Sequence, residues 1–244
     1  MVLVPIKCPH CKNINVAKYG LSSVGNQRYY CSDCKKTFQN DYTYKACDAE
    51  TRSKIYFATI NGNGTRATAR MLGIDPGTVT STLRDFESLL WFVNHDYLNA
   101  QHEHGMEVEI VSGTEAEMDE MWSFVHDKSQ QYWLWWAIDH NTGVPLAFCF
   151  GTREHKYFNE LKALLADFNI TIAYVDNNPA YDKLDCDTVV GKRNTQKIER
   201  KHLSLRTWCS RLVRKGIRFS KSHIMHKIVV ALIINHWFFE RILV

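Results

Sequence analysis

Two pairs of cysteines near the N-terminus have the spacing of a metal site. Cys8 and Cys11 form one Cys-x-x-Cys pair, and Cys31 and Cys34 form a second pair farther along the chain. Two such pairs can arrange four thiolates tetrahedrally around Zn²⁺, which closes the site to substrate. The sequence therefore predicts a structural zinc site made by these four cysteines, in a segment too short to fold on an apolar core alone.

Three carboxylic acids in the rest of the chain occupy unusual surroundings. Asp119 lies inside an aromatic run, Asp176 directly follows the apolar run 170–175, and Glu199 stands among basic residues. A carboxylate inside a strand is costly unless a cation satisfies it, and the carboxyl end of a strand is the usual ligand end of an α/β sheet. Taken singly, each could be an ion-paired surface acid. Together they predict a catalytic site that holds two Mg²⁺ or Mn²⁺ ions for phosphoryl transfer.

These acids need a scaffold, and the pattern from residue 115 onward predicts one. Three short runs rich in aromatic and β-branched residues predict an antiparallel meander: 117–125, 131–139 and 144–150. A helix over 153–167, a strand over 170–175 and a long helix over 195–214 follow. The order β-β-β-α-β-α predicts an α/β layer architecture with a mixed sheet.

Residues 48–93 read as three helices. Asp48 can cap a helix to about Ile60, a short helix runs over 66–72, and Asp75-Pro76 opens a third helix to about Trp91. The Gly-containing turn between the last two helices is typical of a helix-turn-helix. A three-helix packing unit without DNA contact is the alternative. The candidate DNA-binding residues of this segment are Arg66, Arg70, Thr78, Thr80 and Arg84.

The net charge of +4 conceals three unequal segments. Residues 1–93 carry +5, residues 94–190 carry −12, and residues 191–244 carry +11. An acidic centre between basic ends predicts a protein that binds a polyanion and attracts cations in its middle. Six basic residues around Glu199 are candidates for DNA phosphates: Lys192, Arg193, Lys197, Arg200, Lys201 and Arg206. The apolar C-terminal stretch is interrupted too often by His and charged residues for a membrane span.

Five motifs together resemble one family. They are the run from Gln27 through Cys31 and Cys34 to Phe38, then Gly64-Thr-Arg66-Ala-Thr-Ala-Arg70, Glu117-Met-Asp119-Glu120-Met-Trp122, Asp176-Asn-Asn-Pro179-Ala-Tyr181 and Thr195-Gln-Lys-Ile-Glu199-Arg. In this order they resemble the transposases of the smallest bacterial insertion sequences, the insertion-sequence-one family. Two positions depart from the family pattern, with Asn177 where Gly is usual and Lys201-His202 where His-Asn is more frequent.

The resemblance implies a multidomain fold. It implies a zinc-ribbon finger over 1–47, an all-α helix-turn-helix over 48–93 that binds terminal inverted repeats, a linker over 94–114 and an RNase H-like catalytic domain over 115–244. By motif, the DDE triad falls on Asp119, Asp176 and Glu199, the three acids that their surroundings select.

The function that follows is Mg²⁺-dependent DNA cleavage and strand transfer. The expected partners are double-stranded DNA, both element ends and target, and further copies of the chain in a homodimer or higher oligomer. We expect the protein in the cytoplasm, associated with the nucleoid and without a membrane span. Two alternatives remain open from the sequence, a catalytically inactive DNA-binding regulator and a nuclease of the same fold that cuts without joining.

Overall fold

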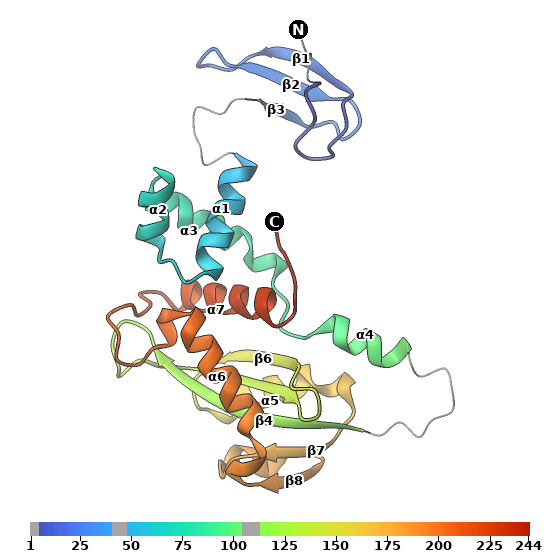
Figure 1. Ribbon diagram of the computed structural model, residues 1–244, viewed down its shortest axis with the longest axis vertical. Helices are drawn as coiled ribbons and strands as arrows, with labels where there is room; N and C mark the ends of the chain where they lie inside the picture. Colours follow the sequence, from blue (N-terminus) through green and yellow to red (C-terminus); the bar gives the residue numbers. More distant parts are fainter. Residues whose placement is uncertain (1–4, 41–47, 104–112) are drawn as a thin grey trace.

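The computed structural model describes residues 5–40, 48–103 and 113–244 (Figure 1). Its N-terminal part is a three-stranded antiparallel sheet in the order β1-β2-β3. The strands are β1 (Val16–Leu21), β2 (Gln27–Cys31) and β3 (Thr37–Gln39). Apart from the cysteines, the buried core of this part is small and centres on Phe38, as expected for a segment that a metal must hold together.

Three helices follow, where the sequence predicts them. They are α1 (Ala49–Ile60), α2 (Thr65–Leu72) and α3 (Pro76–Asp85). The Asp48 side chain accepts hydrogen bonds from the first amides of α1, and Asp75 caps α3 in the same way. Gly73 ends α2 in the left-handed conformation at φ 63°. The third helix is shorter than predicted, because a 3₁₀ turn (Glu87–Leu89) replaces its last part.

The segment expected to be a linker contains a helix. Residues His95–Glu103 form α4, whose start is fixed by the buried Asn94: its carbonyl oxygen accepts from the Leu98 amide, and its side chain accepts from the Tyr97 amide. The polar composition of this stretch concealed the helical pattern. The second half of the expected linker, residues 104–112, lies outside the described residues.

A mixed five-stranded sheet forms the centre of the C-terminal part. Its strands are β4 (Thr114–Phe124), β5 (Gln131–Asp139), β6 (Pro145–Gly151), β7 (Ile170–Val175) and β8 (Asp187–Val190). Their order is β6-β5-β4-β7-β8, with β5 antiparallel to its two neighbours and β7 parallel to both β4 and β8. The meander and the mixed sheet are as predicted. The short edge strand β8 was missed because all four of its residues are exposed and give no apolar pattern.

Helices cover both faces of this sheet. Helix α5 (His155–Leu164) packs on one face, and α6 (Gln196–Trp208) and α7 (His223–Trp237) pack on the other. Side chains alternate along β5, so that Trp135 belongs to the α5 side and Trp136 to the α6 and α7 side. Both indoles are fully buried, which makes these two tryptophans core residues rather than a platform for bases.

Helix α6 is shorter than predicted and ends at Trp208, with Cys209 as its C-cap in an extended conformation. A 3₁₀ turn (Ser210–Leu212) and a loop then lead to α7, ten of whose residues are buried. Although α7 is strongly apolar, no helix in the described part of the chain has both the length and the apolar character to cross a membrane.

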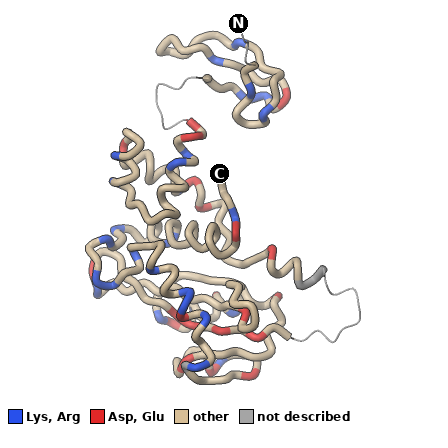
Figure 2. Tube along the Cα trace, viewed as in Figure 1, with Lys and Arg blue, Asp and Glu red and all other residues tan. Residues whose placement is uncertain are grey.

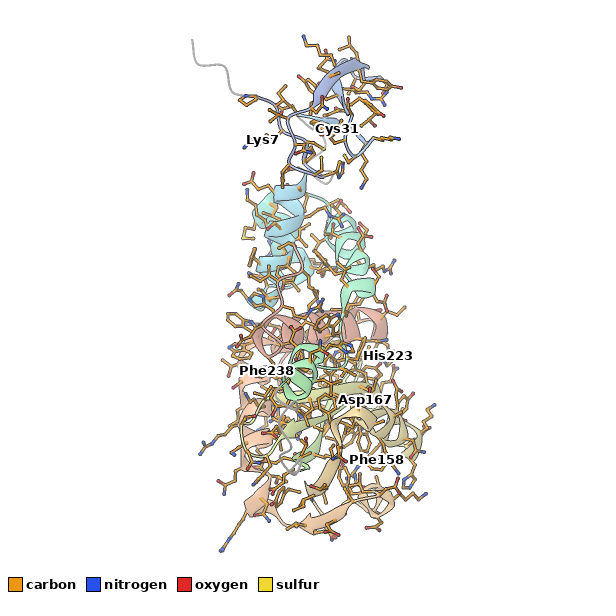
Figure 3. The ribbon with its side chains drawn as sticks, turned by 90° about the vertical axis from the view of Figure 1, so that its right-hand side faces the viewer. Lys7, Cys31, Phe158, Asp167, His223 and Phe238 are labelled. Atoms are coloured by element: carbon orange, nitrogen blue, oxygen red, sulfur yellow. The ribbon has the colours of Figure 1, made fainter. Side chains whose placement is uncertain are left out.

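Helix α7 joins the N-terminal helices to the sheet. Figure 3 labels His223 and Phe238 near its two ends and shows α1 to α3 on one side of it and the sheet on the other. Tyr56 of α1 lies 3.0 Å from the Nδ1 atom of His236, and the Trp237 indole donates to the Ile60 carbonyl at 3.2 Å. Residues of α1, α3, α7 and the sheet share one apolar cluster. The three helices are therefore packed on the α/β layer through α7.

Asn235 is the polar centre of this junction. It is fully buried in α7; its side-chain oxygen accepts from the Trp91 amide at 2.9 Å, and its nitrogen donates to the Trp91 and Ala231 carbonyls at 2.8 and 2.9 Å. These bonds link the segment after α3 to a helix whose buried residues are mostly apolar.

We expect Asn235→Ala to lower the free energy of unfolding by about 2 kcal/mol, because both backbone groups of Trp91 lose their partner. Urea denaturation followed by tryptophan fluorescence measures the change. Ile224→Ala is the control, since Ile224 lies on the same helix and is 53% exposed. Equal midpoints for the two variants would show that the Asn235 bonds do not hold the junction together.

Candidate metal centres

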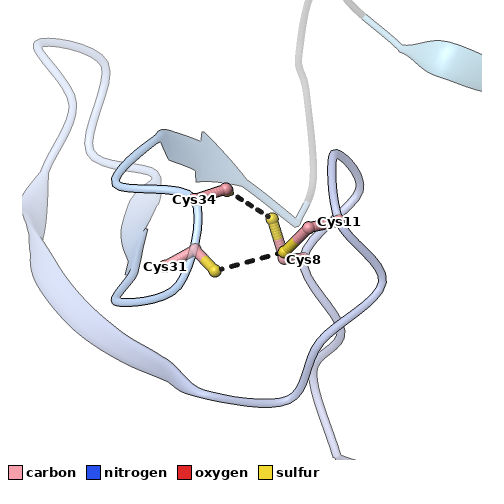
Figure 4. A group of neighbouring side chains, drawn as sticks. All are labelled: Cys8, Cys11, Cys31 and Cys34. Carbon is pink, nitrogen blue, oxygen red and sulfur yellow. Dashed lines mark hydrogen bonds between the residues drawn. The ribbon is translucent and has the colours of Figure 1, made fainter.

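The four predicted zinc ligands come together in the N-terminal sheet (Figure 4). The sulfur atoms of Cys8 and Cys34 are 3.6 Å apart, and those of Cys11 and Cys31 are 3.5 Å apart. Four thiolates at about 2.3 Å from Zn²⁺ in a tetrahedron would have sulfurs separated by about 3.8 Å. The sulfur separations are far longer than a disulfide bond, of about 2.05 Å. This donor set therefore fits a tetrahedral zinc ion.

The second cluster lies on the open edge of β4. Strand β7 pairs with β4 only as far as Glu117, and β7 ends at Val175. Asp119 lies on β4 just beyond this pairing, and Asp176 directly follows β7. Asp119, Glu120 and Asp176 each offer a carboxylate oxygen within 4.8 Å of the other two. The structure thus brings together two of the three predicted catalytic acids and adds Glu120.

The carboxylate of Asp119 is buried among other negative charges. Burial, together with the charges of Glu120, Asp176 and Glu199, raises the pKa of Asp119 to about 7, although the Glu120 amide donates to its carboxylate. In the described part of the chain, no lysine or arginine forms an ion pair with Asp119, Asp176 or Glu199. A divalent cation is the partner that such a group of oxygens would accept.

Glu199 is placed by helix α6, which packs on the same face of the sheet. The side chain is exposed and does not belong to the close cluster, but its charge acts on Asp119. A carboxylate on a helix can approach a metal held by the two aspartates, although it is not within 4.8 Å of them here. The structure therefore places the third acid near the site rather than inside it.

His202, one turn after Glu199, also faces the cluster. Its Nε2 accepts a hydrogen bond from the Trp136 indole at 2.8 Å, and its Nδ1 lies 3.6 Å from Asp119. Burial and the nearby Arg206 and Arg214 lower the pKa of His202 to about 3. The ring is therefore neutral and carries its proton on the side of Asp119, which makes it a buried positioning group and not a phosphate contact.

Glu120 points to the opposite face of β4 and anchors the loop that carries Asp176. Its buried carboxylate accepts from Arg153 at 3.1 Å, from the Asn178 amide group at 2.6 Å and from the Tyr181 hydroxyl at 2.8 Å. Because these donors already occupy its oxygens, Glu120 acts as a positioning residue for the loop. The sequence did not single out Glu120 as a functional residue, although consecutive acids on one strand must point to opposite faces.

Glu117 positions helix α6, as Glu120 positions the loop of Asp176. It is 1% exposed, accepts from the backbone amide of Ile198 at 3.0 Å and lies 3.0 Å from the His140 ring. Helix α6 has no side-chain cap of its own, so this carboxylate from β4 supplies an acceptor to its first turn. The amide that it binds immediately precedes Glu199, which fixes the backbone from which that side chain extends.

The turn at Asp176 does not require glycine. Asn177 is not among the residues with positive φ, so the asparagine found where the family usually has glycine introduces no backbone strain. The Asp176 carboxylate accepts from the Asn178 amide at 3.1 Å, and the Asn178 side chain in turn accepts from the Ala180 amide at 3.1 Å. The loop after β7 therefore contains two successive Asx turns, in which the side chains of Asp176 and Asn178 each accept from the backbone amide two residues later.

The candidate DNA-binding residues of the helical segment are only partly accessible. Arg66, Arg70 and Arg84 are exposed, and Thr80 is half-buried with its hydroxyl bonded to the Pro76 carbonyl. Thr78 differs from the expectation, because it is 8% exposed and lies on the inward face of α3. A groove contact is therefore closed to Thr78 in this structure and remains a prediction for the other four.

The basic candidates near Glu199 lie along α6 and the turn before it (Figure 2). Lys197 donates to the His140 and Asn141 carbonyls, and Lys201 lies over the Phe238 ring at 4.8 Å. Lys197, Arg200 and Lys201 line one cavity of about 420 Å³. Arg193 is exposed. Arg206 is half-buried and interacts electrostatically with Asp119. The side chain of Lys192 lies outside the described part.

The family described as IS1 transposase matches residues 112–240, and the InsA N-terminal domain, a zinc ribbon, matches residues 1–35. Insertion element iso-IS1n protein InsB of Shigella dysenteriae is 44% identical over 127 residues, which are 51% of this chain and 97% of that protein. Insertion element IS1 protein InsB of Shigella sonnei is 40% identical over 125 residues, which are 49% of this chain and 93% of that protein.

Among solved structures, the catalytic core domain of BIV integrase is 13% identical, with a TM-score of 0.34 over 52% of this chain and 85% of that one. The assignment depends on the InsB relatives and on the family match, whose residues 112–240 include the carboxylate cluster. The chain belongs to the IS1 transposase family and is a DDE transposase, an enzyme of DNA cleavage and strand transfer.

Proposed function

We propose that Asp119, Asp176 and Glu199 are the catalytic triad of this transposase and hold the Mg²⁺ or Mn²⁺ ions of a two-metal reaction. One observation carries the proposal: the carboxylates of Asp119 on β4 and Asp176 after β7 lie close together, and the charge of Glu199 on α6 raises the pKa of Asp119. No described lysine or arginine forms an ion pair with any of these three acids. The sheet order β6-β5-β4-β7-β8 supports the RNase H-like assignment for this part.

The reaction we infer has two steps. A water oxygen forms a bond to phosphorus at the end of the element while the bond from phosphorus to the 3′ oxygen breaks, which frees a 3′-hydroxyl. That hydroxyl then attacks a phosphodiester of the target DNA and displaces a second 3′ oxygen. Divalent cations, when bound, would stabilise the negative charge that develops on the attacking and leaving oxygens.

The protein's own residues position the reacting groups. Glu120 holds the loop of Asp176, Glu117 holds the start of α6, and His202 with Trp136 fixes the surroundings of Asp119. The six basic candidates along and before α6 would bind phosphates beside the acids, which offsets the repulsion between the carboxylates and DNA.

The N-terminal parts would select and hold the DNA. The zinc ribbon and the helix-turn-helix of α2 and α3 would bind the terminal inverted repeats, with Arg66, Arg70, Thr80 and Arg84 as the contacts. Because transposition joins two ends, we infer a homodimer or larger assembly on the DNA, associated with the nucleoid. A regulator without catalysis, or a nuclease that cuts without joining, would keep the same binding parts, and the products formed on DNA separate the three.

We expect Asp176→Asn to reduce cleavage and strand transfer at least a hundredfold while DNA binding stays within about twofold, because the change removes a charge from the cluster and leaves the fold intact. Labelled terminal-repeat DNA incubated with a target plasmid and Mg²⁺ gives both readouts. Asp167→Asn is the control, because Asp167 is exposed and lies in the 3₁₀ turn after α5. Strand transfer at the wild-type rate in Asp176→Asn would remove this residue from the triad.

We expect Glu117→Ala to lower the strand-transfer rate about tenfold or more without changing the dissociation constant for DNA, because the buried Ile198 amide loses its acceptor and Glu199 is displaced. Glu117→Gln keeps an acceptor oxygen and should restore most of the rate. Glu160→Ala, an exposed change, controls for loss of charge. If the glutamine variant is as slow as the alanine variant, the bond to the helix does not position Glu199.

We expect the purified chain to contain about one Zn²⁺ and Cys31→Ser to lose it, because three thiolates leave the tetrahedron incomplete. Zinc released on denaturation is measured with a chromogenic chelator. The matched control is Cys186→Ser, since Cys186 is half-buried and lies outside the cluster. Full zinc content in Cys31→Ser would exclude the four-cysteine site.

A further inference from the structure

A cavity of about 380 Å³ lies where the turn between α1 and α2 meets the segment joining α6 to α7. The floor is apolar and consists of Met225, Val229 and Ile233 of α7. The two walls approach each other closely, because a Cβ atom at Gly62 would lie 2.8 Å from the Trp208 carbonyl oxygen. The cavity is therefore built by both the helical part and the α/β layer.

The polar lining of this cavity has one sign of charge. Arg66 comes from α2, Arg211 from the 3₁₀ turn, and Arg218 and Lys221 from the loop before α7. No Asp or Glu occurs among the described residues that line it, and none of the four basic side chains forms an ion pair with another described residue. Four unneutralised cations around one cavity favour an anion inside it.

Arg211 makes the strongest case for an anion. Its guanidinium donates to the Ser220 hydroxyl at 3.3 Å, which accounts for one of its five N–H groups. Burial of the guanidinium lowers the pKa of Arg211, whereas a carboxylate partner would raise it. A largely buried charge without a counterion is costly, and an anion in the cavity would remove that cost.

The N-terminus of α2 adds to this field. Gly64 is the N-cap of α2 and offers no side-chain acceptor to the first amides of the helix. Gly64, Thr65 and Arg66 all line the cavity. The N-terminus of α2, which has no side-chain cap and carries the positive end of the helix dipole, therefore lies beside the same cavity as the basic side chains.

We propose that this cavity binds a backbone phosphate of the DNA held by α2 and α3, and that the α/β layer supplies half of the site through Arg211, Arg218 and Lys221. The inference rests on the proposed function and extends it, since these three residues are outside the predicted DNA-binding set. DNA is favoured over a small phosphate ligand because the cavity opens beside α2, and the first helix of such a pair crosses the DNA backbone.

The first test uses the geometry of Gly64. Its φ of −78° suits any residue, and an added Cβ would meet no atom within 4 Å. Gly64→Asp and Gly64→Asn should both cap α2 and leave the melting temperature unchanged or higher. We expect Gly64→Asp, the charged variant, to bind a labelled 30-base-pair duplex at least fivefold more weakly than Gly64→Asn at low salt, with the difference shrinking as salt rises.

The second test addresses the opposite wall. The double variant Arg218→Gln with Lys221→Gln removes two exposed charges, so folding should be retained. We expect the slope of log affinity against log salt to fall by about 0.9 for each lost phosphate contact. Lys215→Gln, in the same loop but away from the cavity, should leave the slope unchanged.

Equal affinity of Gly64→Asp and Gly64→Asn would overturn the inference, as would equal slopes for the double variant and the wild type. Saturable stabilisation of the chain by inorganic phosphate, lost in Gly64→Asp without any change in DNA binding, would assign the cavity to a small ligand and also overturn it. If one of these overturning results is obtained while the wild type still cuts and joins DNA, this inference fails and the proposed function stands. If it neither binds nor cuts DNA, the proposed function fails as well.

Discussion

The structure depends on keeping several carboxylates close together on one strand. Burial and mutual repulsion both oppose this, as the raised pKa of Asp119 shows. Successive side chains of β4 alternate between the two faces of the sheet, which separates these acids. Glu117 and Asp119 face α6, while Glu120 faces the other side. Glu117 and Glu120 are satisfied by hydrogen-bond donors and fix the elements that carry Glu199 and Asp176. The Asp119 carboxylate is therefore available for the proposed metal ion.

Helix α7 connects the N-terminal helices to the sheet, again through buried polar side chains whose hydrogen bonds are satisfied. It is buried on both sides, and each side packs against a different partner. Its polar side chains mark the contacts that must be specific: His226 lies 3.1 Å from the Ser123 hydroxyl of β4, and Asn235 bonds to Trp91 beyond α3. Apolar packing supplies most of the contact area, and these buried polar bonds fix the position of helices α1 to α3 relative to the sheet.

Much of this architecture could be predicted from the sequence because the signals are local. Asp48, Gly73 and Asp75-Pro76 mark helix ends with side chains or backbone angles that act within a few residues, and the meander follows from alternation in β4 to β6. Strand β8 and helix α4 lack an apolar pattern, and both were missed. The partners of Glu117 and Glu120 lie 23 to 81 residues away in the chain, and no spacing rule reaches that far.

The two ends of α6 connect the carboxylate cluster with the basic cavity. The first turn of the helix contains the Ile198 amide that donates to Glu117, and the helix ends at Trp208, whose carbonyl lies close to Gly62 in the turn before α2. Its 13 residues span about 20 Å at about 1.5 Å each. Because α6 is packed on the sheet and protein interiors deform very little, its two ends stay at a nearly fixed separation. If the cavity binds a DNA phosphate as proposed, that phosphate would be held at a fixed distance from Glu199. The geometry of α6 would then determine which phosphodiester of the bound DNA reaches the proposed catalytic acids.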